Sequence, residues 1–171
     1  MQTTTYHRIV VPRRGPPDVM QWVEDDLPAP APGEDRVKVE ATGVSGYDIM
    51  QRGQWFPGFT KTPYTPGEDI IGVVDAVGRG VPTLSPGQRV AGWTFGDAGG
   101  YAEYVCRPAE QLVPVPAALD PAIAAALVTN YLTASLALHK TARATRGERV
   151  LVHGAAGGLG SALLQLGKLA G

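Results

Sequence analysis

The chain contains very little cysteine and almost no net charge. Cys106 is the one cysteine among 171 residues, which excludes an internal disulfide framework and a zinc site built from several cysteines. The net charge of −1 provides no basic excess, so we expect no nucleic-acid partner. We find no apolar run of 18 residues and no signal-peptide pattern, so we expect no membrane partner and a cytoplasmic location.

Glycine and proline, by contrast, are abundant, with 22 and 15 residues. They divide the first 120 residues into short apolar or alternating segments, and many short strands at this spacing predict a compact β-barrel or sandwich. Asp48 is expected as the N-cap of a short helix. The aromatic and proline-rich residues 54–66 are expected either to wall an apolar pocket or to cover the barrel. The expected strands cover residues 6–11, 19–23, 37–41, 70–77, 88–93, 101–107 and 112–116.

The composition changes at Asp120-Pro121. Asp at an N-cap followed by Pro at the first helical position predicts the start of a helix. The Ala-rich residues 122–128 continue it, Thr129 and Asn130 are expected to interrupt it, and residues 131–143 predict a second helix. We therefore place the domain boundary within residues 119–129.

The last 22 residues, VLVHGAAGGLGSALLQLGKLAG, predict the first unit of a dinucleotide-binding fold. Residues 150–153 predict a strand, residues 154–160 a glycine-rich turn and residues 161–170 a helix. Such a turn lets the backbone approach a pyrophosphate, and the helix N-terminus supplies free N–H groups and a positive dipole. The turn departs from G-x-G-x-x-G because Ala155 stands where the first glycine would, and an ordinary strand-to-helix turn remains the alternative.

Six motifs in this order resemble the medium-chain dehydrogenase/reductase superfamily, within it the zinc-independent, quinone-oxidoreductase-like branch. They extend over nearly the whole chain, and their order is more specific than any one of them. The motifs are GVSGYD at residues 43–48, PGEDIIG at 66–72, PGQRV at 86–90, GGYAEY at 99–104, NYLTA at 130–134 and VHGAAGGLG at 152–160.

The resemblance implies a mainly β, GroES-like barrel domain over residues 1–120. After it come linker helices and the first βα unit of an α/β Rossmann domain, incomplete, over residues 121–171. It also implies transfer of a hydride from NADPH, with NADH possible, to a quinone or an α,β-unsaturated carbonyl compound. The parent protein would be a homodimer. Its small-molecule substrate would be a carbonyl compound or a quinone.

By the resemblance, this chain differs from zinc-dependent relatives at the positions of their zinc site. Zinc-dependent relatives carry Cys at the position of Ser45 and a His-Glu pair at the positions of Glu68 and Asp69. A serine hydroxyl is a poor zinc ligand at neutral pH, so no zinc is expected. Because neighbouring residues of a strand point to opposite faces, we expect Glu68 and Asp69 to serve the turn and the start of a strand rather than to act as an acid–base pair.

Without a metal, hydrogen bonds must polarise the substrate carbonyl. The catalytic candidates are Tyr47, Ser45 and Asn130. A tyrosine packed in the barrel is the alternative for Tyr47, and helix-break or cap chemistry is the alternative for Asn130 and Thr133. Relatives often place a tyrosine two positions after the Asp, where this chain has Met50. The cofactor-binding candidates are Asn130, Thr133, Gly154, Ala155, Gly157, Gly158, Leu159 and Gly160.

The chain stops before the position, about 20 residues after the first glycine, that reads the ribose 2′ position. We therefore expect a fragment of a longer oxidoreductase. The alternatives are half of a split enzyme and a GroES-like binding module that has lost catalysis.

Overall fold

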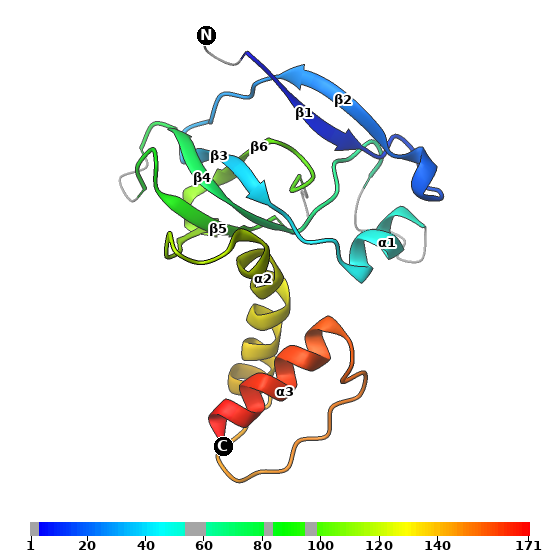
Figure 1. Cartoon of the computed structure of the whole chain (residues 1–171), viewed down its shortest axis with the longest axis vertical. Helices are drawn as coiled ribbons and strands as arrows, with labels where there is room; N and C mark the ends of the chain where they lie inside the picture. Colours follow the sequence, from blue (N-terminus) through cyan, green and yellow to red (C-terminus); the bar gives the residue numbers. More distant parts are fainter. Residues whose placement is uncertain (1–3, 54–60, 81–83, 95–98) are drawn as a thin grey trace. The chain divides into compact units, whose positions relative to one another are not determined.

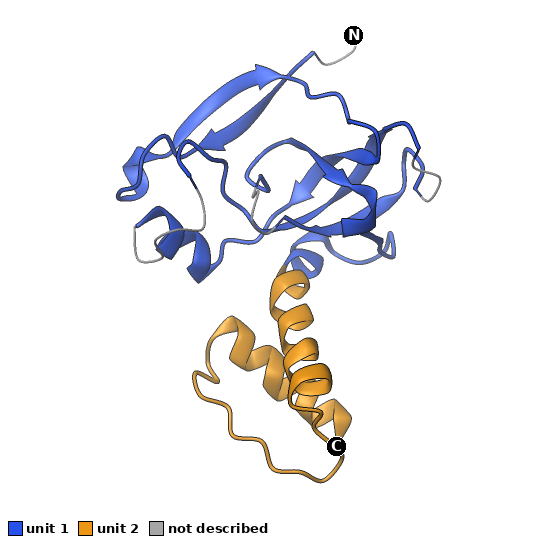
Figure 2. Cartoon of the chain, turned by 180° about the vertical axis from the view of Figure 1, so that it is seen from behind, with its two compact units in different colours: residues 1–125 blue, residues 126–171 orange. Residues whose placement is uncertain are grey.

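The computed structural model describes residues 4–53, 61–80, 84–94 and 99–171 (Figure 1). The chain divides into two compact units, residues 1–125 and residues 126–171 (Figure 2).

The first unit is built on antiparallel strands (Figure 1). Strands β1 (Thr5–Val10) and β2 (Gln21–Asp26) form a two-stranded sheet. The other sheet has the order β6-β3-β4-β5-β7. Its strands are β3 (Glu34–Ala41), β4 (Asp69–Val77), β5 (Arg89–Trp93), β6 (Tyr104–Pro108) and β7 (Leu112–Pro114).

Backbone hydrogen bonds join β1 to the segment that leads into β6. The Ile9 amide donates to the Tyr101 carbonyl at 2.8 Å, and the Glu103 amide donates to the His7 carbonyl at 2.9 Å. These bonds join the two sheets, as the predicted GroES-like barrel requires. The buried side chains of the larger of two hydrophobic clusters come mostly from β3, β4 and β5. They are Val37, Ile70, Val74, Leu84, Val90, Val105 and Leu112.

Two expectations for the first unit need correction. Residues 19–23 do not form one strand: a 3-10 turn, η1 (Pro17–Val19), precedes β2, because Pro17 fixes the backbone for a turn. The strand β2 then continues to Asp26 because it pairs with β1 along its whole length. Asp48 is the third residue of α1 (Gly46–Arg52), and the N-cap is Ser45.

The second unit contains most of α2 (Pro121–Ser135) and all of α3 (Gly158–Ala170). The Asp120 carboxylate accepts hydrogen bonds from the amides of Ala122 and Ile123 at 2.9 and 3.0 Å, which confirms the predicted start of α2. The predicted interruption at Thr129 and Asn130 is wrong. The good helix formers around them carry the helix on.

The helix changes instead at a π-helical turn, η3 (Leu136–Thr141). Arg143, with φ of +52°, follows the end of this turn. Together α2 and η3 form a helix over Pro121–Thr141 that is long and apolar enough, by length and composition, to cross a membrane. This corrects the expectation that no such span occurs. Length and composition alone assign no membrane role, since core helices of soluble proteins pass the same test.

The predicted strand at residues 150–153 does not form. A strand needs a neighbour for its N–H and C=O groups, and no described strand pairs with this segment. The side chains of Val150 and Leu151 are 54% and 81% exposed. The predicted turn and helix do follow, with α3 starting at Gly158, three residues earlier than expected.

Replacing a fully buried residue of β4 tests the position of the core. We expect Ile70→Ala to lower the free energy of unfolding by about 2–5 kcal/mol, because Ile70 is 0% exposed and its removal leaves a cavity. Ile123→Ala is the matched control, since Ile123 is 57% exposed and its loss should change stability by less than about 0.5 kcal/mol. Urea denaturation of both variants measures the difference, and equal midpoints would contradict this core.

Candidate functional site

The N-terminus of α1 is fixed by a reciprocal pair of hydrogen bonds. The Asp48 amide donates to Ser45 Oγ at 3.2 Å, and the Ser45 amide donates to Asp48 Oδ2 at 2.7 Å. Ser45 Oγ also donates its own proton to Asp48 Oδ2 at 2.9 Å. This capping box satisfies the helix N-terminus and engages the Ser45 hydroxyl both as donor and as acceptor.

The second oxygen of Asp48 reaches a different part of the chain. The Gly67 amide donates to Asp48 Oδ1 at 3.1 Å, so one buried carboxylate joins α1 to the turn before β4. Gly67 has φ of +97°, and a Cβ on it would lie 2.6 Å from the Tyr101 ring. Only glycine fits this close approach. Thr94, which follows β5, holds the same turn because its Oγ1 donates to the Gly67 carbonyl at 2.5 Å.

Two carboxyl side chains follow Gly67, and both are buried. Glu68 and Asp69 are each 6% exposed. Burial, and then the neighbouring Asp48 and Asp69 carboxylates, raise the pKa of Glu68 to about 7. Within the described part of the chain, Glu68 Oε1 has no hydrogen-bond partner. Strand alternation did not predict this cluster, because the burial of both side chains depends on tertiary packing.

Two tyrosines adjoin these acids. Tyr47, a catalytic candidate, is half-buried on α1. Desolvation, followed by the charges of Glu68 and Asp48, raises the pKa of its phenol. Burial and Asp48 also raise the pKa of Tyr101. Asp48 and Tyr101 line a cavity of about 150 Å³ together with Val44. Sequence reasoning did not select Tyr101, which belongs to the GGYAEY motif.

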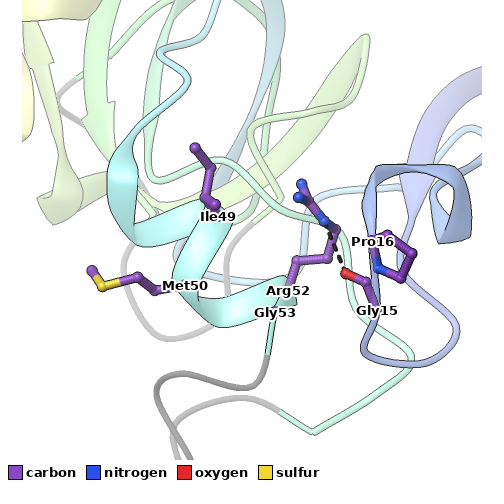
Figure 3. A pocket seen from close by; sticks show the side chains of 6 residues that line it. All are labelled: Gly15, Pro16, Ile49, Met50, Arg52 and Gly53. Carbon is purple, nitrogen blue, oxygen red and sulfur yellow. Dashed lines mark hydrogen bonds between the residues drawn. The ribbon is translucent and has the colours of Figure 1, made fainter.

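A second hollow is lined by residues of α1 and of the segment before η1 (Figure 3). Its volume is about 390 Å³, and Ile49, Met50 and Arg52 line it with Gly15 and Pro16. Met50, which stands where relatives often have tyrosine, therefore contributes to the lining. Arg52 Nε donates to the Gly15 carbonyl at 3.2 Å. Of the loop expected to wall a pocket, residues 54–60 lie outside the described part of the chain.

The glycine-rich turn of the second unit has backbone requirements of its own. Gly154 has φ of +70°, and the Gly157 amide donates to its carbonyl at 3.0 Å. A Cβ on Gly160 would lie 2.2 Å from the Gly154 carbonyl oxygen and 2.6 Å from the Cα of Ala155. The turn and the first turn of α3 therefore pack backbone against backbone.

Asn130 lies next to this turn. A Cβ on Gly158 would lie 2.9 Å from the Asn130 side-chain nitrogen, so the amide of α2 and the first residue of α3 are in close proximity. The Tyr131 hydroxyl donates to Gln165 Oε1 at 2.8 Å and ties the same two helices together. Thr133 is exposed on α2.

The N-terminus of α3 fits an anion. Its N-cap, Gly157, makes no side-chain hydrogen bond, and the first turn contains no acidic residue. Gly157, Gly158 and Leu159 are exposed, and the Gly157 amide donates to the Gly154 carbonyl. A helix N-terminus with this exposure offers N–H donors and a positive dipole to a phosphate. The structure thus brings Asn130 to the predicted phosphate turn, and it puts Ser45 and Tyr47 on α1.

The described residues include no group of three or more His, Cys, Asp or Glu side chains arranged to hold a metal ion. Cys106 is half-buried, and burial raises the pKa of its thiol to about 11, which disfavours the thiolate that metals bind. The zinc-free reaction remains a prediction.

Three comparisons identify proteins similar to this chain. The model of the alcohol dehydrogenase GroES-like domain matches residues 31–117. Quinone oxidoreductase of Rattus norvegicus is 39% identical over 160 residues, which are 92% of this chain and 48% of that protein. The crystal structure of human synaptic vesicle membrane protein VAT-1 homolog-like protein superposes with a TM-score of 0.92 at 31% identity, over 97% of this chain and 53% of that one.

A mycobacterial protein solved in complex with NADPH also superposes, with a TM-score of 0.86 at 34% identity, over 96% of this chain and 50% of that one. The chain thus spans about half the length of the relatives it matches. It consists of a GroES-like domain followed by the start of a Rossmann domain, as the sequence predicted. By its domain match and its relatives, the chain belongs to the medium-chain dehydrogenase/reductase superfamily, in the quinone-oxidoreductase-like branch of the alcohol dehydrogenase GroES-like family.

Proposed function

We propose that the chain supplies the barrel and the first phosphate turn of a zinc-independent NADPH-dependent oxidoreductase, which reduces a quinone or an α,β-unsaturated carbonyl compound. The observation that carries the proposal is the turn before α3, where a Cβ at Gly160 would overlap the Gly154 carbonyl and no side chain caps the helix N-terminus. When bound, the nicotinamide supplies the hydride.

The residues of the second unit would bind the cofactor. Gly157, Gly158, Leu159 and Gly160 would line the diphosphate site, where the amides of Gly158, Leu159 and Gly160 and the dipole of α3 would face the anion, since the Gly157 amide already donates to the Gly154 carbonyl. The Asn130 amide beside Gly158 and the exposed Thr133 hydroxyl would bind the nicotinamide carboxamide or ribose. Gly154 and Ala155 shape the turn, because Gly154 takes a left-handed backbone conformation and the Ala155 carbonyl accepts from Ser161 Oγ at 3.4 Å.

The residues of the first unit would act on the substrate. Tyr47 is the better donor to a carbonyl oxygen, since the Ser45 hydroxyl already donates to Asp48. Ser45 would then fix α1, and with it Tyr47, in place. A donor set of one hydroxyl and buried carboxyl groups also suits hydrogen-bond polarisation better than zinc binding.

The relatives support an oxidoreductase function. Several are named quinone oxidoreductases, and one neighbour was solved with NADPH. For the whole protein we propose a homodimer that works in the cytoplasm without nucleic-acid or membrane partners. These relatives favour the oxidoreductase over the non-catalytic binding module.

Substituting the first residue of α3 tests the phosphate turn. We expect Gly158→Asp to weaken NADPH binding at least about tenfold, since it adds a negative charge and a Cβ that would lie 2.9 Å from the Asn130 amide. Gly167→Asp is the control, because Gly167 lies in the same helix and a Cβ on it would meet nothing within 4 Å. Quenching of protein fluorescence by NADPH gives both dissociation constants. Equal constants would remove the turn from the cofactor site.

A comparison of NADPH with NADH tests where cofactor selectivity resides. In this fold the ribose is read about 20 residues after the first glycine of the turn, and that position lies past Gly171. We therefore expect the chain to bind NADPH and NADH with dissociation constants within about fivefold of each other, and to turn over an enone or quinone slowly. Tight, NADPH-selective binding with rapid turnover would show that the first 171 residues contain the complete site.

A further inference from the structure

A third hollow lies within the first unit, among residues of β1, β2, β3 and the segment that leads into β6. Its volume is about 360 Å³, which falls in the range of about 300–1,000 Å³ that is typical of sites for small molecules. The described residues that line it do not include the catalytic candidates Ser45, Tyr47 and Asn130. The proposed reaction therefore assigns this hollow no ligand.

Backbone hydrogen bonds fix the frame of the hollow. The Glu103 amide donates to the His7 carbonyl at 2.9 Å, and the Val39 amide donates to the Glu103 carbonyl at 2.8 Å. The segment before β6 thus bridges β1 and β3, and the bond from the Ile9 amide to the Tyr101 carbonyl fastens it a third time. A frame held in this way exists before a ligand arrives, which lowers the cost of ordering it on binding.

The lining is mostly apolar, and two of its side chains are strongly exposed. Trp22 is 65% exposed and Val44 is 78% exposed. The Trp22 ring stacks on the His7 ring, with centroids 5.0 Å apart and planes inclined by 13°. This stack holds the indole in place and leaves most of its surface open. Exposed apolar side chains around a hollow are typical of a binding site. The other apolar side chains of the lining are Ile9, Val39, Ala41 and Ala102.

Most polar side chains of the lining already have partners. Thr42 Oγ1 donates to the Asp69 carbonyl at 2.6 Å. Arg89 donates to Glu40 Oε2 through Nε at 2.8 Å, and its Nη2 lies 2.6 Å from the same oxygen. The Arg89 guanidinium therefore offsets the charge of Glu40. A ligand that needs many hydrogen bonds would find few free groups here.

Glu103 provides the charge that a ligand can meet. Its Oε2 accepts from the His7 amide at 2.7 Å and lies 3.3 Å from His7 Nδ1. In the described part of the chain, no lysine or arginine lines the hollow or forms an ion pair with Glu103. Because His7 contacts both the indole of Trp22 and Glu103, the aromatic ring and the carboxylate are close neighbours. An indole beside a carboxylate favours an organic cation and disfavours an anion.

We propose that this hollow binds a small aromatic amine in its protonated form. The aromatic ring of the ligand lies against Trp22 and the apolar side chains, and its ammonium group lies at Glu103. Charge complementarity and the apolar lining together select this ligand class over a neutral polar molecule or an aromatic acid. The site does not depend on the proposed oxidoreductase activity, since no cofactor or catalytic candidate takes part in it.

Three probes of one shape test the ligand class. Isothermal titration calorimetry of the whole chain at neutral pH compares 2-naphthylmethylammonium with the neutral 2-naphthylmethanol and the anionic 2-naphthoate. We expect the ammonium to bind at least about fivefold more tightly than the alcohol and at least about tenfold more tightly than the carboxylate. Added salt should weaken binding of the ammonium and not of the alcohol. Equal dissociation constants for the three probes, or no measurable binding of the ammonium, would overturn the proposal.

Replacing Trp22 tests the aromatic wall. Trp22→Ala should weaken binding of both the ammonium and the alcohol at least about fivefold, and Trp22→Phe, which keeps an aromatic ring, should restore part of the affinity. Trp93→Ala is the matched control, because Trp93 is 40% exposed on β5 and does not line the hollow. An affinity for the ammonium that survives Trp22→Ala would refute this site.

Replacing Glu103 tests the charge separately from the apolar contact. Glu103→Gln should remove the advantage of the ammonium over the alcohol and leave the affinity for the alcohol nearly unchanged. Glu110→Gln is the control, because Glu110 is exposed on the 3-10 turn η2 (Ala109–Gln111) and does not line the hollow. If Glu103→Gln keeps the full preference for the ammonium, Glu103 does not receive the cation and the proposal is wrong.

Discussion

The bridge formed by the Asp48 carboxylate is the constraint on which the site in the barrel depends. One of its oxygens caps α1 through Ser45, and the other accepts from the Gly67 amide at 3.1 Å. A buried carboxylate is stable only where hydrogen bonds replace its water, and here both oxygens receive them. The bridge therefore fixes α1 against the turn before β4, which sets where Tyr47 and Glu68 lie.

The same bridge also influences the charges around Glu68. Burial of Glu68, and then the charge of Asp48 held near it, raise the pKa of Glu68 to about 7. Burial, and then the charges of the neighbouring carboxylates, also raise the pKa of the Tyr47 and Tyr101 phenols.

Sequence patterns predicted strands and helix ends well where neighbouring residues in the sequence determine them. Alternation predicted β3 and β6, the apolar run at residues 70–77 predicted β4, and Asp120-Pro121 predicted the start of α2. Sequence patterns failed where the structure depends on pairing with distant parts of the chain. The strand at residues 150–153 needs a neighbour, and η3 arises at a place where no proline or glycine signals it. The motifs identified Ser45 and Tyr47, but the burial of Glu68 depends on contacts from Gly67 and Thr94 that are distant from α1 in sequence.

The hydrogen-bond ladder of the described strands is complete at Pro114, well before α3 begins. During synthesis these strand pairings can therefore form while the second unit is still being made. The apolar residues Val150 and Leu151 emerge from the ribosome after these strands, and their side chains, 54% and 81% exposed, add apolar surface to the nascent chain.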